Sequence, residues 1–347
     1  MLPFAPPLEP MLAEAQDEIP AGDGWLYEPK WDGFRAIVFR DGDSVHLCSR
    51  NGQPLQRYFP ELVEALKAVL PERIIIDGEI ILPSERGLDF DALQARIHPA
   101  ASRITKLSQE TPSGFVAFDC LALGDADLRE KSTTERREVL VANFRSSGSL
   151  FVTPFTSSIE EAKRWFVEFE GAGCDGVIAR RTELAYLPGE RVMVKIKHGR
   201  IADCVVGAYR LGKKPDTVGS LLLGLYDEHG VLHHIGHTSS FSAKEKRELL
   251  EKLKPYEGGE SFGHGRTPDA PSRWSKNKTE DGPTWVPLRP ELVCEVRYDY
   301  LQGPRFRHAS TFKRWRTDKS PRDCLFSQLL PPNPFSLEKI IKLGGKR

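Results

Sequence analysis

Runs of apolar residues along the chain predict a series of β-strands with a few helices between them. Three runs rich in β-branched or aromatic residues, at positions 34–40, 74–82 and 115–121, are typical of buried strands. Apolar residues recur every three to four positions at 60–70 and 159–170, which predicts amphipathic helices. The first part of the chain is therefore expected to be an α+β domain.

A second group of elements follows residue 200. Short strands are expected at 203–211, 220–226, 231–236, 292–300 and in the basic segment near 306–316, with one helix at 243–253. Five short strands and a helix fit a β-barrel OB-fold. We expect domains at 1–200 and 201–330, joined by a short polar hinge near 197–202, and a proline-rich C-terminal tail at 331–347.

The segment from Glu28 to Arg35 has the pattern Lys-x-Asp-Gly-x-Arg, centred on Lys30. A lysine amine has a pKa of about 10.4 and is inert near neutrality unless its surroundings lower that value. Asp32 can hold a hydroxyl, a metal-bound water or the lysine, and Arg35 offers a guanidinium suited to phosphate or ribose. We expect Lys30 in the loop that enters the strand at 34–40, as a nucleophile in an activating site. A surface turn with a chance salt bridge is the alternative.

Polar residues within the predicted strands form a second set of candidates. Glu79 interrupts an apolar run and is a candidate for a ribose or a metal, and Phe118 is a candidate for stacking on a base. Asp175 precedes another strand, and alternation places Lys195 and Lys197 on one face, where two ammonium groups favour phosphate. Taken alone, Phe118 is more often a core residue, and the two lysines a solvated strand edge.

In this order and spacing, the segments resemble the nucleotidyltransferase superfamily of ATP-dependent DNA ligases, RNA ligases and mRNA capping enzymes. The resemblance covers nearly the whole chain, and it implies an ATP-consuming enzyme with an adenylation domain. The resemblance implies that Lys30 forms a lysyl-AMP phosphoramide, with Asp32 and Arg35 in the same catalytic motif. It implies that Glu28 and Phe118 contact adenine, and that Arg35 and Glu79 contact the ribose. It further implies phosphate contacts from Arg50, Lys195 and Lys197, and a divalent metal, Mg²⁺ or Mn²⁺, at Glu79 and Asp175. Asp175 stands where the family usually has glutamate, and Met193 where many DNA ligases have tryptophan.

Residues in the C-terminal third of the chain indicate which branch of this superfamily the chain resembles. Arg316, Asp318 and Lys319 resemble the last ligase motif, which implies that Arg316 and Lys319 meet the triphosphate and orient pyrophosphate when the second domain closes. Basic residues dominate positions 305–322, where Asp318 is the single acid, although the formal net charge of the chain is zero. The whole pattern looks like a bacterial ATP-dependent repair ligase of the ligase C type, which seals nicks in duplex DNA.

Other readings stay open at this point. An RNA ligase or a capping-type nucleotidyltransferase is the alternative enzyme, and a catalytically dead OB-fold protein that binds nucleic acid is the alternative outside catalysis. An NAD-dependent ligase is disfavoured, because only 29 residues precede Lys30. The expected partners are nicked duplex DNA and a repair polymerase or end-binding protein.

Composition limits the class of protein but does not indicate a reaction. The 347 residues are 39% hydrophobic and 28% charged, which is ordinary for a globular protein with two cores. No stretch reaches the roughly 20 apolar residues of a membrane span, and the first residues lack a signal pattern. The six cysteines are scattered without a CxxC pair, which favours reduced core residues. We therefore expect a cytoplasmic monomer without zinc or disulfides.

Overall fold

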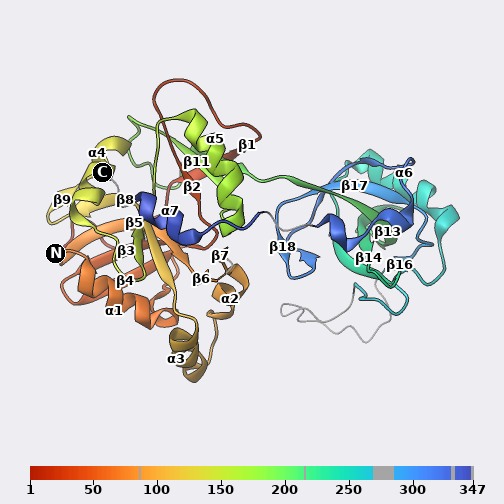
Figure 1. Ribbon diagram of the computed structural model, residues 1–347, viewed down its shortest axis with the longest axis horizontal. Coiled ribbons are helices and arrows are strands. Elements are labelled where there is room, and N and C mark those ends of the chain that lie inside the picture. The colour runs from red at the N-terminus through yellow and green to blue at the C-terminus, as the bar shows by residue number, and fades with distance from the viewer. Residues whose placement is uncertain (86, 215, 269–284, 330–332, 345–347) are drawn as a thin grey trace. The chain divides into compact units, whose positions relative to one another are not determined.

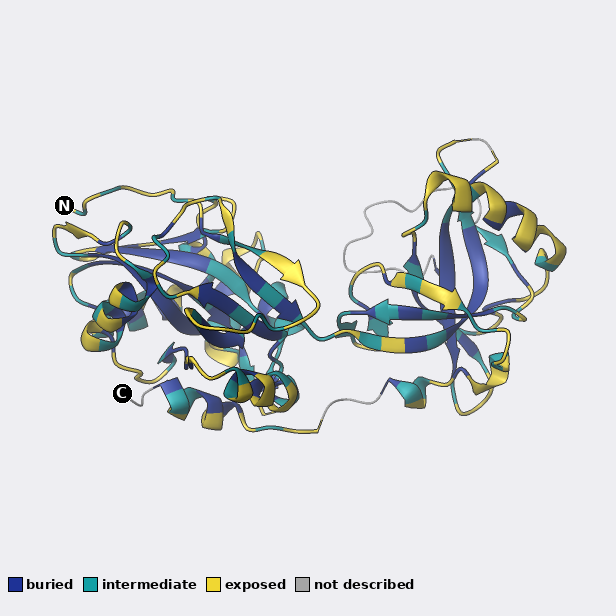
Figure 2. Cartoon of the chain, turned by 90° about the horizontal axis from the view of Figure 1, so that it is seen from above, coloured by how far each residue is buried: buried dark blue, intermediate teal, exposed yellow. Residues whose placement is uncertain are grey.

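The computed structural model describes residues 1–85, 87–214, 216–268, 285–329 and 333–344. The chain divides into two compact units, one made of Met1–His198 and Pro331–Arg347 and the other of Gly199–Leu330. Each unit has buried strands at its centre and exposed helix faces outside, as the burial colours of Figure 2 show. No helix in the described part of the chain is long and apolar enough to cross a membrane.

A six-stranded sheet forms the centre of the first unit (Figure 1). Its main order is β10-β8-β5-β3-β4, and β9 pairs with β8 at the side. The strands are β3 (Phe34–Asp41), β4 (Ser44–Ser49), β5 (Arg73–Ile81), β8 (Gly114–Leu123), β9 (Ala126–Asp127) and β10 (Leu150–Val152). The three predicted apolar runs are thus β3, β5 and β8, and they are continuous because β5 and β8 are buried on both faces.

Helices cover one face of this sheet with the residues that their periodicity selects. In α1 (Pro60–Val69), Leu62 and Leu66 are buried in a cluster with Ile74 and Ile76 of β5. Helix α4 (Thr133–Asn143) begins at a capping box and adds Leu140 to the same cluster. The helices predicted at 60–70 and 159–170 are confirmed as α1 and α5 (Ile159–Glu168).

A second, four-stranded sheet has the order β1-β12-β11-β2. Its strands are β1 (Leu12–Gln16), β2 (Trp25–Lys30), β11 (Gly176–Arg181) and β12 (Arg191–Lys197). Met11 and Met193, at this sheet, share a buried cluster with Ile37 and Ile75 of the larger sheet. The two sheets therefore pack together through apolar side chains.

Two glycines allow the close approaches that this packing needs. A Cβ on Gly33 would lie 2.1 Å from the Ile80 carbonyl oxygen, and one on Gly176 would lie 2.0 Å from the Ile196 carbonyl oxygen. Gly176 also has a φ of +146°, which disfavours other residues. These glycines stand beside Asp32 and Asp175, so they fix the backbone that carries both carboxylates.

The second unit contains a sheet of order β15-β14-β13-β17-β20, with β16 paired to β13. An isolated bridge between Thr238 and Ser310 joins the end of β15 to the start of β20, so the edge strands of the sheet meet. The five predicted strands and the predicted helix are all present. They are β13 (Arg200–Leu211), β14 (Val218–Tyr226), β15 (Leu232–Thr238), β17 (Val293–Tyr298), β20 (Thr311–Trp315) and α6 (Ala243–Leu253).

The first strand of this unit starts earlier than the sequence predicts. We expect a strand from residue 203, but β13 begins at Arg200, where it pairs with Tyr298. Only His198 and Gly199 separate it from β12. Residues 200–202, which we expect in the hinge, are strand residues because β17 supplies hydrogen-bond partners for them.

The expectation of a C-terminal tail at 331–347 is wrong for the described residues. Helix α7 (Leu337–Gly344) packs on the first unit, with Leu337 and Ile340 buried. Residues 331, 332 and 345–347 lie outside the described residues. The segment orders because its apolar positions meet an apolar surface of the first unit rather than solvent.

The remaining elements are short or peripheral. They are β6 (Pro83–Ser84), β7 (Gly87–Leu88), α2 (Phe90–Ala95), α3 (Ala101–Glu110), η2 (Phe169–Ala172), β16 (Val286–Pro287), β18 (Leu301–Gln302) and β19 (Arg305–Phe306). The 3-10 turns are η1 (Gln56–Tyr58), η3 (Lys254–Tyr256), η4 (Pro321–Asp323) and η5 (Phe326–Gln328). All six cysteines are buried and free, as their scatter predicts.

Candidate active site

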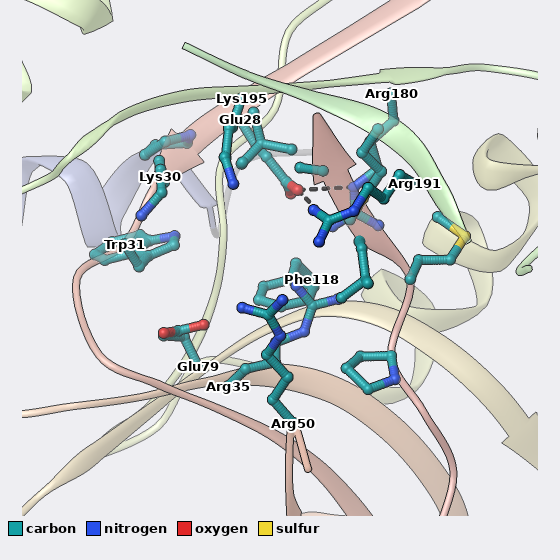
Figure 3. A pocket seen from close by; sticks show the side chains of 17 residues that line it. Glu28, Lys30, Trp31, Arg35, Arg50, Glu79, Phe118, Arg180, Arg191 and Lys195 are labelled. Carbon is teal, nitrogen blue, oxygen red and sulfur yellow. Dashed lines mark hydrogen bonds and ion pairs between the residues drawn. The ribbon is translucent and has the colours of Figure 1, made fainter. Parts of the chain in front are cut away.

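A pocket in the first unit brings together most of the residues that the sequence singles out (Figure 3). Strands of both sheets contribute to it. Among the predicted site residues, its lining contains Glu28, Lys30, Arg35, Arg50, Glu79, Phe118 and Lys195. These seven positions span residues 28 to 195, so the fold collects them from segments far apart in the chain.

Lys30 is the last residue of β2, so it ends a strand rather than lying in the loop before β3. Its Nζ donates to Asp175 Oδ2 at 2.5 Å. Lys197 Nζ lies 3.4 Å from the same oxygen. Asp32 is buried in the turn that follows, and its charge also acts on the lysine. The Lys30 side chain is 19% exposed, which leaves it accessible from the pocket.

The expectation that the site lowers the pKa of Lys30 is not met, because its surroundings raise this pKa. Burial acts to lower the pKa, but the Asp175 carboxylate, with smaller contributions from Glu79 and Asp32, raises it above its usual value. The pKa of Asp175 is lowered, since Lys30 and Lys197 together outweigh its burial. This ion pair therefore favours the protonated ammonium form of Lys30.

Glu79 is a carboxyl group at the pocket whose pKa is shifted upward. Burial raises its pKa to about 8, against the lowering influence of Arg35 and Lys30. No group of three or more potential metal ligands occurs among the described residues. Mg²⁺ commonly binds one or two carboxylates together with substrate phosphates. Glu79 and Asp175 both act electrostatically on Lys30 and supply oxygen ligands of that kind, so these residues fit a phosphate-bound divalent metal.

Arg35 is oriented by a buried carboxylate that the sequence reasoning left without a role. Its Nε and Nη2 donate to Asp77 at 2.6 and 2.7 Å, and Tyr186 Oη donates to the same carboxylate at 2.6 Å. The guanidinium carbon lies 4.3 Å from the centroid of the Phe118 ring. Asp77 therefore fixes Arg35 beside Phe118, with only part of its donor edge available to a ligand.

A buried network of ion pairs supports the other side of Phe118. Arg180 Nε donates to Glu28 Oε1 at 2.8 Å, and Arg180 Nη1 donates to Asp119 Oδ2 at 3.0 Å. Arg136 completes the network with two bonds to Asp119. Figure 3 shows the Glu28–Arg180 bonds as dashed lines at the pocket. The Glu28 side chain is thus held by Arg180, and Asp119 links this pair to Arg136.

Several cations face the pocket from β12 and from the turn after β4. Burial, Lys197, Lys30, Arg191 and Arg50 together lower the pKa of Lys195. Such a concentration of positive charge favours a phosphate chain.

Arg180 and Arg191 are pocket residues that the sequence reasoning missed. A signal for Arg191 is present, because alternation places it on the same face of β12 as Lys195 and Lys197.

Arg316 and Lys319 belong to the second unit and do not line this pocket. Arg316 follows β20 and is held by Asp203, at 2.7 and 2.8 Å, and by Asp318, at 2.8 and 2.9 Å. Lys319 is partly exposed. The predicted basic segment is therefore an ordered surface of the second unit, in which acids fix the direction of Arg316.

An α+β unit with a lysine motif at a cation-lined pocket, followed by an OB-like unit, defines a nucleotidyltransferase. Comparison with known proteins specifies the branch. Residues 10–197 match the model of the ATP dependent DNA ligase domain, and residues 214–319 match that of the ATP dependent DNA ligase C terminal region. The chain therefore belongs to the ATP-dependent DNA ligase family and is of the bacterial ligase C type.

The relatives cover almost the whole chain. DNA ligase C of Mycobacterium tuberculosis is 50% identical over 98% of this chain and 98% of its own length. DNA ligase C1 of Mycolicibacterium smegmatis is 48% identical over 98% and 99%. A solved Lig E DNA ligase has a TM-score of 0.56 at 18% identity, covering 88% of this chain and 99% of its own, which shows a common fold.

These comparisons confirm the predicted resemblance, the adenylation and OB-fold architecture, and DNA ligase activity. RNA ligase, capping enzyme and non-catalytic binding protein are not favoured. The family also implies ATP and a divalent metal ion, without specifying which metal.

Proposed function

We propose that Lys30 is the nucleophile that attacks the α-phosphorus of ATP, forming lysyl-AMP and releasing pyrophosphate. The observation that carries this proposal is the position of Lys30, paired with Asp175 at the rim of a pocket that also holds Phe118 and several cations. The amine must lose its proton to attack. Departure of Asp175 toward a cation would remove the interaction that raises the pKa of Lys30.

The other pocket residues bind and orient the nucleotide in this proposal. Phe118 stacks on adenine, Glu28 lies near the base, and Arg35 contacts the ribose region. Phosphate contacts come from Arg50, Lys195 and, in addition, Arg191 of the pocket. Lys197, whose Nζ lies 3.4 Å from Asp175 Oδ2, adds a further contact. Burial of the site strengthens these charge interactions relative to water. Asp32 keeps the turn after Lys30 in place and adds negative charge beside the amine.

Glu79 and Asp175 are the proposed ligands of Mg²⁺ or Mn²⁺, both of which suit carboxylate and phosphate oxygens. A bound metal supplies neutralisation of charge on the phosphate oxygens. Arg316 and Lys319 of the second unit orient the pyrophosphate during the first step. Their surface must then leave the nucleotide so that AMP can reach DNA, which makes domain movement part of the cycle.

The proposed polynucleotide substrate is a nick in duplex DNA. AMP passes from Lys30 to the 5′-phosphate, and the 3′-hydroxyl then attacks that phosphate and releases AMP. We propose that the enzyme acts as a cytoplasmic monomer in DNA repair, together with a polymerase or an end-binding protein. Contacts to phosphates predict low sequence specificity and an affinity for DNA that falls with salt.

The test is incubation with ATP or GTP labelled at the α-phosphate, followed by addition of nicked duplex DNA. Label from ATP should attach to the protein and then chase into sealed DNA. Lys30→Ala should remove all protein label while the fold persists, and Lys163→Ala, on the exposed face of α5, is the matched control. Label retained by Lys30→Ala would remove Lys30 from the mechanism, and label from GTP alone would indicate capping chemistry.

A further inference from the structure

Helix α7 shares a buried apolar cluster with the residues next to Lys30 and Asp175. One buried apolar cluster contains Trp31, which directly follows Lys30, and Cys174, which directly precedes Asp175. Leu337 and Ile340 of α7 belong to the same cluster, and Ile340 is fully buried. The C-terminal helix therefore belongs to the apolar cluster that includes a neighbour of each member of the ion pair.

Close backbone contacts show that α7 and the segment before it pack at a specific site on the first unit. A Cβ on Gly344, at the end of α7, would lie 1.8 Å from the Val152 carbonyl oxygen. A Cβ on Gly171 would lie 1.8 Å from the Asn333 carbonyl oxygen, in the segment that leads into the helix. Glycine is thus required at both positions, because a larger side chain would collide with the facing carbonyl oxygen. Fixed contacts of this kind distinguish the helix from a loosely attached tail.

Two short series of contacts connect this packing site with the residues next to Lys30 and Asp175. Trp31 Nε1 donates to Thr153 Oγ1 at 2.8 Å, and Thr153 follows the residue on which Gly344 rests. On the other side, the Phe335 ring lies 5.3 Å from that of Phe169, and the Phe169 carbonyl oxygen accepts a hydrogen bond from Cys174 N at 3.1 Å. The strand ends themselves are joined, since Asp175 N donates to the Lys30 carbonyl oxygen at 2.8 Å.

We propose that α7 is a positioning element for lysine adenylation, in which Leu337 and Ile340 hold Trp31 and Cys174 so that Lys30 and Asp175 keep their reactive geometry. This inference rests on the proposed role of Lys30 as the nucleophile. Misplacement of a reacting group by about 1 Å can lower a rate by about 100-fold. The step that depends most on α7 is therefore attack by Lys30, whereas joining of a nick that already carries AMP does not use the lysine as a nucleophile.

The experiment compares Ile340→Ala and Leu337→Ala with Lys342→Ala, whose side chain is on the exposed face of α7. We expect the two core variants to reduce the rate constant of self-adenylation at saturating ATP by roughly 10- to 100-fold. ATP affinity and sealing of a pre-adenylated nick should change by less than about 3-fold, which is roughly 0.6 kcal/mol. Ile340→Val should recover most of the rate, and Lys342→Ala should match the wild type. Equal losses in both steps, or an unchanged adenylation rate, would overturn the proposal.

The experiments distinguish failure of the proposed role of α7 from failure of the proposed role of Lys30. Label transfer that survives Lys30→Ala rejects the proposed nucleophile. Label transfer that needs Lys30 but proceeds at the wild-type rate in Ile340→Ala rejects only the role of the helix.

Discussion

Lys30 and Asp175 are 145 residues apart in the sequence, yet Lys30 Nζ lies 2.5 Å from Asp175 Oδ2. The antiparallel pairing of β2 with β11, in which Gly176 lies opposite Lys30, brings them together. The carboxylate raises the pKa of the amine. In the proposed mechanism the lysine is restrained until Asp175 binds another cation, which would couple ligand binding to activation of Lys30.

Replacement of Asp175 by asparagine should lower the pKa of Lys30. The carboxylate that raises this pKa would be lost, while burial, which lowers it, would remain. A lower pKa leaves more uncharged amine near neutrality, so Lys30 should react faster there with an amine reagent, as competitive labelling and mass spectrometry across pH would measure. Self-adenylation should nevertheless fall by roughly 10-fold or more, since the proposed metal loses a ligand. Asp127→Asn, a surface pair with Arg129, is the control; an unchanged Lys30 pKa would contradict the prediction.

Binding of a divalent metal should release a proton from Glu79. Burial raises the pKa of this carboxyl to about 8, so the group carries a proton at lower pH, whereas a metal requires the carboxylate. Metal affinity should therefore rise with pH up to about 8 and level off above it. Calorimetry in buffers of different ionisation enthalpy measures the proton, and Glu79→Gln should abolish its release. Release that persists in Glu79→Gln would assign the proton to another group.

Removal of the Phe118 ring should weaken ATP binding. Stacking of a base on an aromatic side chain contributes about 1–3 kcal/mol, so Phe118→Ala should raise the Kd for ATP by roughly 5- to 150-fold. Phe118→Tyr keeps the ring and should bind ATP nearly as the wild type does. Because Phe118 is 5% exposed, thermal unfolding must show that the alanine variant remains folded. A folded alanine variant with wild-type affinity would exclude stacking on this residue.

Loss of Arg316 or Lys319 should affect the first chemical step most. Arg316→Ala and Lys319→Ala should each slow self-adenylation by about 10-fold or more, the loss expected for a charge-assisted hydrogen bond of about 1.5–3 kcal/mol to phosphate. Sealing of a pre-adenylated nick requires no pyrophosphate and should change less. Lys313→Ala, an exposed residue of β20, is the matched control. Comparable losses in both assays would argue against a role in orienting pyrophosphate.

Most of the elements follow from local sequence, because burial leaves a short-range pattern. The apolar run in β5 and the recurring leucines of α1 each record which side of one element faces the core. The resemblance carried by the segment around Lys30 also selects the family. Such motifs are local because a turn, a strand end and a neighbouring charge can be specified within a few residues.

Pairing between distant segments is different, since it depends on strand register and on packing that no single segment contains. Asp175 looks like a metal ligand in the sequence, and only the β2–β11 register shows that it holds Lys30 as an ammonium. Arg35 likewise looks free to bind phosphate, but the fold gives it Asp77 as a partner. The pKa of each group follows from these partners.

Helix α7 is a whole element that local sequence did not predict. Its eight residues are too few to be stable as an isolated helix, and prolines precede them, so local sequence favours a tail. The sequence by itself determined the family, the order of most strands and helices, and the lysine motif. The tertiary structure decided that α7 orders against the first unit and that Asp175 pairs with Lys30, because both depend on surfaces that exist only after distant segments have packed together.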